Sequence, residues 1–251
     1  MNKNNKKVNA IIILIGNEIL SGRTQDANAT FLSKWLNELG VRVEEVRVIL
    51  DEQKVIVNCI NEVRKKFKYV FTTGGIGPTH DDITAECIAA AFNCHLVLDE
   101  DAVTCLSRSG RALNPARLKM AHVPEGASLI DNSLSNAPGF RVENVFVLAG
   151  VPSVARAMFS TFADDLGVGG SIYSRNVDVF LPEGDIAQPL EDLALKYSTV
   201  EIGSYPFFRD GCYGANLVVR GMDESVVEKV IGLVVATMRN LGDESSVGEP
   251  S

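Results

Sequence analysis

Short apolar runs and longer amphipathic stretches alternate along the first two thirds of the chain. Continuous runs such as Ala10–Ile15 and Tyr69–Thr73 predict buried strands, whereas Ala27–Leu39, with apolar residues three and four positions apart, predicts a helix. The same reasoning predicts strands at Val41–Leu50, Leu96–Leu98 and Val145–Ala149, and helices at Gln53–Phe67, Asp82–Phe92, Asp99–Met120 (in two pieces) and Pro152–Leu166. This order predicts an α/β fold with three layers, in which helices cover both faces of a mostly parallel sheet.

The pattern changes after the glycine-rich segment Gly167–Gly170, which we interpret as a linker. The elements predicted beyond it are strand Arg175–Leu181, helix Asp185–Tyr197, strands Val200–Tyr205 and Gly214–Arg220, and helix Glu224–Leu241. This order predicts a small α+β module with a partly antiparallel sheet. We therefore expect two domains, residues 1–170 and 171–251, the second ending in a frayed tail.

Composition narrows the class of function. The 251 residues are 46% hydrophobic and 22% charged, as is usual for a globular protein. A net charge of −8 argues against a nucleic-acid surface, and no apolar run is long enough to span a membrane. The five cysteines form neither a disulfide framework nor a metal-binding pair. We expect a cytoplasmic protein whose partners are small molecules.

The segment Thr73–Thr84 carries the strongest chemical signal. Its glycines lie between a predicted strand and a predicted helix, where backbone N–H groups can bind an anion. It has no Gly-Lys-Ser/Thr sequence, and His80 stands where a dinucleotide fingerprint needs its third glycine. Asp81 and Asp82 would repel a phosphate unless a cation lay between them. The alternative is structural: Thr79 caps the helix and Asp82 completes a capping box.

Other acidic residues belong to loops that follow predicted parallel strands. Glu18 lies in the turn Gly16–Arg23, and Asp51 follows the second strand, where it could instead cap the next helix. Loops after parallel strands open on the same edge of the sheet. We therefore expect Glu18 and Asp51 to join Asp81 and Asp82 around one pocket. Such carboxylates favour a hard cation such as Mg²⁺ or Mn²⁺, and a cation bridged to phosphate indicates phosphoryl or pyrophosphoryl chemistry.

The motifs resemble a known family. GNEILSGRTQDAN, TTGGIGPTHDDIT, NAPGF and GVPS, together with Asp51 at the end of a strand, are similar to the molybdopterin-binding (MoaB/Mog-like) fold over about residues 8–166. Within that fold, the chain most resembles the amino-terminal domain of the competence/damage-inducible protein A (CinA) family. The second module, with Ile202–Pro206, resembles the stretch that follows this domain in stand-alone relatives and in eukaryotic FAD synthases. The amidase domain of full-length competence/damage-inducible proteins is not matched.

The resemblance implies metal-dependent hydrolysis of a nucleotide pyrophosphate such as ADP-ribose or FAD. It assigns catalysis to Asp82, Asp51 and Glu18, with Asp81 and Asp82 holding Mg²⁺, Mn²⁺ or Co²⁺. We expect substrate contacts from residues of the four turns, namely Gly74, Gly75, Gly77, Thr79, Gly16, Ser21, Gly139, Gly150 and Pro152. The alternatives are a non-catalytic module that binds molybdopterin or a nucleotide, and adenylyl transfer to molybdopterin. The resemblance also implies a homo-oligomer.

Some positions depart from the family pattern. Asn17 stands where the family usually has aspartate, which removes one carboxylate from the predicted pocket. Ser135-Asn136 replaces Gly-Thr, Ala149 replaces proline and Val154 replaces glutamate. The main glycine–aspartate motif is intact. These departures bear on the choice of substrate and on turnover.

Overall fold

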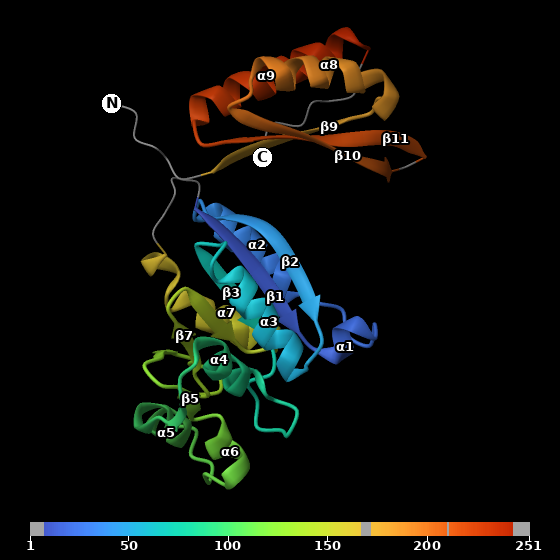
Figure 1. Ribbon diagram of the computed structural model, residues 1–251. Coiled ribbons are helices and arrows are strands. Elements are labelled where there is room, and N and C mark those ends of the chain that lie inside the picture. The colour runs from blue at the N-terminus through green and yellow to red at the C-terminus, as the bar shows by residue number, and fades with distance from the viewer. Residues whose placement is uncertain (1–7, 167–171, 210, 243–251) are drawn as a thin grey trace, which may run out of the picture. The chain divides into compact units, whose positions relative to one another are not determined.

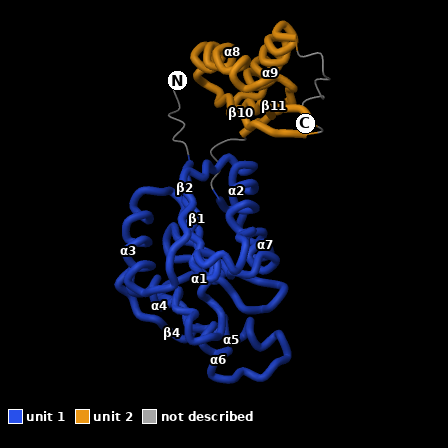
Figure 2. The backbone as a smooth tube through the Cα atoms, turned by 90° about the vertical axis from the view of Figure 1, so that its right-hand side faces the viewer, with its two compact units in different colours: residues 1–169 blue, residues 170–251 orange. Residues whose placement is uncertain are grey.

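The structure is a computed structural model that describes residues 8–166, 172–209 and 211–242. The chain divides into two compact units, residues 1–169 and 170–251 (Figures 1 and 2). The predicted linker Gly167–Gly170 spans this boundary but lies outside the described residues, as does residue range 243–251 of the predicted tail. Each unit is described separately below.

The first unit is built on a six-stranded sheet with the strand order β2-β1-β3-β8-β7-β6. Its strands are β1 (Asn9–Ile15), β2 (Arg42–Ile49), β3 (Tyr69–Thr73), β6 (Ser128–Ile130), β7 (Gly139–Val142) and β8 (Val145–Leu148). Strands β2, β1, β3 and β8 run parallel, whereas β7 pairs antiparallel with β8, and β6 pairs antiparallel with β7. The mostly parallel sheet is confirmed, and its antiparallel edge was not predicted.

Helices cover both faces of this sheet, as predicted. Side chains of α2 (Asn28–Glu38) and α7 (Pro152–Ser160) pack on one face, and those of α3 (Gln53–Val63) and α4 (Thr84–Phe92) pack on the other. The remaining elements are α1 (Asn17–Leu20), α5 (Glu100–Ser107), α6 (Pro115–Lys119), a 3₁₀ turn (Ala163–Asp165) and a separate antiparallel pair, β4 (Leu96–Leu98) with β5 (His122–Pro124).

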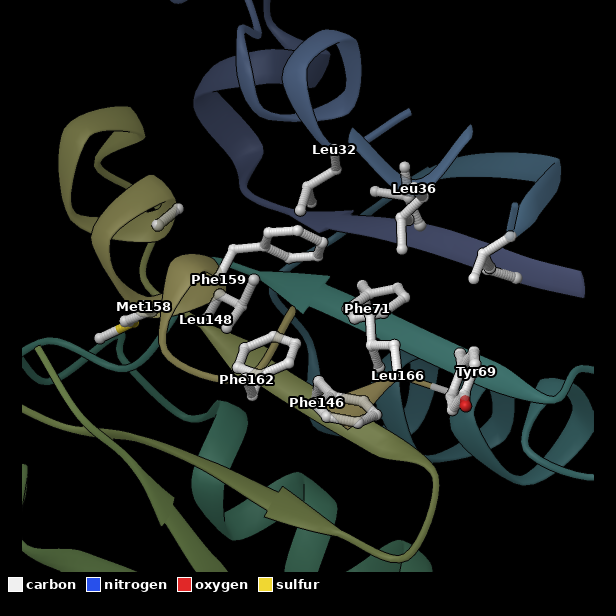
Figure 3. Packing of buried hydrophobic residues seen from close by; sticks show 14 of the residues in the cluster. Leu32, Leu36, Tyr69, Phe71, Phe146, Leu148, Met158, Phe159, Phe162 and Leu166 are labelled. Atoms are coloured by element: carbon white, nitrogen blue, oxygen red, sulfur yellow. The ribbon is translucent and has the colours of Figure 1, made fainter. Parts of the chain in front are cut away.

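Aromatic rings fill the core between the sheet and the α2–α7 layer (Figure 3). Phe71 of β3 stacks on Phe146 of β8 with 5.1 Å between ring centroids, and Phe162 stacks on Phe146 at 4.8 Å. Phe71, Phe146 and Phe159 expose at most 1% of their surface. Because rings are rigid and tightly packed here, the parallel strands are held in fixed register beneath the loops that follow them.

Two predicted helix boundaries were wrong, and the first of them changes the position of two predicted site residues. Helix α4 begins at Thr84, two residues later than predicted, so Asp81 and Asp82 precede the helix. Helix α7 ends at Ser160, and the chain then forms the 3₁₀ turn before Leu166. The other first-unit helices begin and end within a few residues of the predicted positions, apart from the short turn α1, which was not predicted.

The second unit contains a three-stranded sheet with the order β10-β11-β9 and two helices. Its elements are β9 (Tyr173–Val179), α8 (Glu183–Lys196), β10 (Val200–Arg209), β11 (Cys212–Gly221) and α9 (Glu224–Asn240). Both strand pairs are antiparallel, so the sheet is antiparallel throughout rather than partly. Apolar residues of both helices pack on the sheet, for example Ile186 of α8 and Val230 of α9. The predicted α+β module is confirmed.

In the parts of the chain that the structure describes, no helix combines the length and apolarity that crossing a bilayer requires.

Candidate functional site

The loops that carry the predicted site residues leave the same edge of the sheet. Strands β2, β1, β3 and β8 are neighbours and run parallel, so their carboxyl ends form a common rim. Hydrogen bonds tie two of the loops to neighbouring strands: the Gly74 N–H donates at 3.1 Å to the carbonyl of Leu148, the last residue of β8, and the Gly16 N–H donates at 3.3 Å to the carbonyl of Ile49, the last residue of β2. Each of these two loops is therefore fixed to the strand beside it.

Two glycines of the motif occupy backbone positions that other residues would strain. Gly74 has φ +103°, and a Cβ there would lie 2.2 Å from the carbonyl oxygen of Ile15 in β1. Gly75 has φ +67°, and its Cβ would lie 2.1 Å from Thr84 Oγ1. That hydroxyl donates to the Gly74 carbonyl at 3.0 Å, and the Thr84 N–H donates to the Gly75 carbonyl at 3.0 Å. The turn is thereby fixed against the start of α4.

This turn leaves a row of backbone donors unused. Within the described residues, the N–H groups of Gly75, Ile76 and Gly77 donate to no protein acceptor. Gly75 lies against Thr84, the first residue of α4, a nine-residue helix whose dipole adds positive potential at this end. Successive free N–H groups at a helix N-terminus are suited to an anion such as a phosphate.

Asp82 does not act as a helix cap. The N-cap of α4 is Ile83, and Asp82 Oδ2 instead accepts from the Thr79 N–H at 2.8 Å and from the Thr79 hydroxyl at 2.5 Å. The predicted capping pair thus closes a tight turn that precedes the helix. A Cβ on Gly77 would lie 2.7 Å from Asp82 Oδ2, which places the carboxylate beside the free N–H groups.

Asp51 does not cap a helix either, because the N-cap of α3 is Glu52. Its Oδ1 is buried and has no hydrogen-bond partner, and it lies 3.5 Å from the position of a Cβ on Gly75. Burial, and then the charges of Asp82, Asp81 and Glu18, raise the pKa of Asp51. The structure therefore brings the four predicted acids into electrostatic range of one another.

The first loop contributes through its side chains and its shape. Asn17 Oδ1 accepts from the Asp51 N–H at 3.2 Å, so this amide links the loop after β1 to the loop after β2. The carboxylate of Glu18 lies 2.6 Å from the position of a Cβ on the buried Gly16. Ser21 ends α1 and donates its hydroxyl to the Glu18 carbonyl at 3.2 Å. The amide oxygen of Asn17 thus accepts a hydrogen bond, as a carboxylate oxygen could, but it carries no negative charge.

The predicted contact residues of the NAPGF and GVPS motifs lie in different places. A Cβ on Gly150 would lie 3.3 Å from Gly74 Cα, so Gly150 belongs to the rim, and Pro152 begins α7 beside it. Gly139 lies buried in β7, where a Cβ would be 2.5 Å from the Val147 carbonyl oxygen. Gly139 therefore allows two strands to pack closely and is not open to a ligand.

The charges of Asp81 and Asp82 suit a divalent cation, but with limits. Asp81 is exposed, and the Thr79 side chain and its own backbone N–H lower its pKa, so it is ionised at neutral pH. Over the described ranges, no three His, Cys, Asp or Glu side chains are arranged to hold a metal ion. A Mg²⁺-like ion is commonly bound by one or two carboxylates, with water and substrate phosphates completing its shell. Asp81 and Asp82 could supply the carboxylates of a site of this kind, in which water and a phosphate provide the other ligands.

Two basic residues near the motif were missed by sequence reasoning. Lys119 of α6 donates from Nζ to the Thr79 carbonyl at 2.8 Å. Lys119 and His122 share a cavity of about 20 Å³ with Gly75, Gly77 and Asp82. His122 Nδ1 lies 3.0 Å from the Leu118 carbonyl, which can only accept, so Nδ1 carries the proton. Neither residue lies in a glycine turn or in a spaced motif, so only the fold reveals their position.

Comparisons with known proteins agree with this architecture. The family model described as "Probable molybdopterin binding domain" matches residues 11–167, and the model described as "FAD synthase, middle domain" matches residues 171–241. The chain therefore belongs to the molybdopterin-binding (MoaB/Mog-like) domain family. This is the family that the glycine–aspartate motif indicated.

The chain is also similar to particular proteins of this family. A protein of Archaeoglobus fulgidus is 37% identical over 196 residues, which cover 78% of this chain and 85% of that protein. A probable FAD synthase of Caenorhabditis elegans is 31% identical, covering 88% of this chain and 48% of that protein. A CinA-like protein of Desulfosudis oleivorans is 35% identical, and the match covers 71% of this chain and 47% of that protein. The chain thus spans about half the length of the last two.

A solved structure supports the fold of the first unit. The crystal structure of the protein CinA with unknown function from Thermoplasma acidophilum is 36% identical to this chain, with a TM-score of 0.60. The match covers 64% of this chain and 99% of that structure. The shared part therefore corresponds in extent to a single domain.

Proposed function

We propose that the rim binds a nucleotide with a diphosphate bridge, of the ADP-ribose or FAD type, and hydrolyses that bridge with the help of a divalent cation. One observation carries the proposal. The buried Oδ1 of Asp51 has no donor and lies near Gly75, the first of three successive residues whose N–H groups find no acceptor among the described residues. Unused acceptors and unused donors side by side suit a ligand that contains both a cation and an anion.

Each residue has a role that follows from its place. The N–H groups of Gly75, Ile76 and Gly77 orient the diphosphate, while Asp81 and Asp82 hold the cation, which neutralises charge on the phosphate oxygens when bound. Asp51 orients the attacking water and accepts its proton, because a carboxylate with a raised pKa is a stronger base. Lys119 supplies a further positive charge near the phosphates.

The test compares two variants on a panel of ADP-ribose, FAD and NAD, each with Mg²⁺, Mn²⁺ or Co²⁺. Asp82→Asn should lower turnover at saturating metal by about 100-fold or more, the usual cost of losing one electrostatic contact to the transition state. The matched control is Asp164→Asn, an exposed acid of the 3₁₀ turn, which should retain full activity. Near-normal rates in Asp82→Asn would overturn the assignment.

A non-catalytic module that binds a pterin or nucleotide is the second candidate. Asn17 favours it, because it keeps the hydrogen bond to the Asp51 N–H without adding a carboxylate for a metal. Saturable binding without hydrolysis across the whole panel would support this alternative. Adenylyl transfer to molybdopterin makes a different prediction, namely ATP consumption only when the pterin is present.

A further inference from the structure

A second hollow lies between helices α2 and α7. It has a volume of about 530 Å³ and is lined by Phe31, Lys34 and Trp35 of α2, by Arg156 of α7, and by the segment leading into α2. The rings of Phe31 and Trp35 are 5.9 Å apart, and Trp35 also contacts Phe159 of the core at 5.3 Å. We call this hollow the α2–α7 groove. Its floor is aromatic and is anchored in the core.

The groove carries positive charge in a chain that is negative overall. The Arg156 guanidinium lies 5.1 Å from the centroid of the Phe31 ring, and the described residues offer neither Arg156 nor Lys34 an ion-pair partner. The acid in the groove, Asp26, is already used: its carboxylate accepts from the Asn28 and Ala29 N–H groups at 3.0 and 2.8 Å. A guanidinium over an aromatic ring, with a lysine in the same hollow, suits a planar ring that carries an anionic group.

The helix that forms one wall of the groove is hydrogen-bonded to the rim at its first residue. Asn28 is the first residue of α2, and its Nδ2 donates to the Gly150 carbonyl at 2.7 Å. Gly150 in turn lies against Gly74 of the glycine turn. Trp35 follows Asn28 by seven residues, which corresponds to about 10 Å along a helix. A nucleotide whose phosphates occupy the rim carries its ring several bonds away, a length comparable with this rise along α2.

We propose that the α2–α7 groove binds the ring-bearing end of the diphosphate nucleotide, with Trp35 and Arg156 as specificity-determining residues. This inference rests on the function proposed above. The ring stacks against the indole and the guanidinium, and Lys34 contacts the anionic part that enters the groove. Stacking adds affinity without entering the chemistry, so it acts on substrate binding rather than on bond cleavage.

The chain provides its own reporter, because Trp35 is its single tryptophan. Titration with ADP-ribose should change the Trp35 fluorescence saturably, whereas inorganic pyrophosphate, which has no ring, should leave it unchanged. Arg156→Ala should raise the KM for ADP-ribose about tenfold and leave kcat within about twofold, as expected for a cation–π contact. Arg141→Ala is the matched control, since Arg141 lies 4.7 Å from the Phe146 ring and does not line the groove.

The outcomes separate this inference from the proposed function. Asp82→Asn should lose turnover yet keep the fluorescence response to ADP-ribose, because the groove is intact. Hydrolysis of ADP-ribose with no response of Trp35 and an unchanged KM in Arg156→Ala would overturn the groove and leave the proposed function standing. Fluorescence that depends on protein concentration alone would identify the groove as a contact between copies of the chain, and would also overturn it.

Discussion

Two aspartates, one in each unit, have opposite surroundings. In the second unit, Asp178 accepts from Asn216 Nδ2 at 2.6 Å through one oxygen and from Arg209 Nη1 at 2.6 Å through the other. In the first unit, the buried oxygen of Asp51 has no donor, and its charged neighbours are all acids. The three-stranded sheet uses its acid to hold strands together. The rim keeps an acid whose charge the described protein leaves uncompensated, a feature that is common at functional sites.

The largest effect should come from the backbone of the rim. Gly74→Ala places a Cβ against the Ile15 carbonyl at a positive φ, so we expect a loss of about 3 kcal/mol or more in the free energy of unfolding. Gly184→Ala in α8 of the second unit is the control, because nothing lies within 4 Å of its Cβ. It should be neutral or slightly stabilising. Equal unfolding midpoints in urea for both variants would contradict a strained turn.

A smaller effect should follow from removing one hydroxyl that holds the turn. Thr84→Val deletes the buried donor to the Gly74 carbonyl, which should cost about 1–2 kcal/mol and loosen the free N–H groups. Thr237→Val in α9 removes a part-buried hydroxyl that donates to the Leu233 carbonyl, an acceptor within the helix that the backbone ladder already uses, so this control should cost less. Urea denaturation should separate the two variants. If Thr84→Val is as stable as the control, the hydroxyl does not hold the turn.

The smallest effects on stability should come from replacing Asp51 and Asp178 by asparagine, and the two effects should have opposite signs. The pKa of Asp51 is raised in the folded state, so its charge opposes folding at neutral pH, and Asp51→Asn should unfold at a higher temperature than the unmodified chain. This advantage should begin to fade as the pH falls through the folded-state pKa of Asp51, and it should vanish below the lower pKa of the unfolded state, where the acid is protonated in both states.

Asp178→Asn gives the opposite expectation. It weakens two charge-assisted hydrogen bonds at a partly exposed position, so it should lower stability by about 1 kcal/mol or less. Thermal unfolding of both variants at neutral and at mildly acidic pH checks the pair. A destabilised Asp51→Asn at neutral pH would show that its carboxylate is compensated after all.

Much of the fold follows from patterns that the sequence displays, and the failures have physical causes. Strands such as Ala10–Ile15 are continuous apolar runs, and helix α2 repeats its apolar positions at helical spacing. Strands β6 and β7 are three and four residues long, and pairing in the folded sheet defines them rather than local pattern. They were therefore missed, and the antiparallel edge with them.

The site shows the same division. Loops that follow parallel strands must share an edge, so the meeting of Asp51 with Asp82 was predictable from topology. The hydrogen-bond role of Asp82 was not predictable. Thr79 and Asp82 match a capping box in sequence, but the turn that they form ends two residues before the helix begins. Lys119 reaches Thr79 across 40 residues of sequence, a distance over which no motif operates.

The approach of Gly74 to Gly150 has a consequence for how such a domain can diverge. Where two loops meet through glycines, main-chain atoms form the floor of the site, and no side chain separates them. Exchanges in the surrounding walls then alter which molecule is accepted without displacing the amides beneath. Related proteins that keep these two glycines can therefore differ in substrate while the backbone around Gly74 and Gly150 keeps the same geometry.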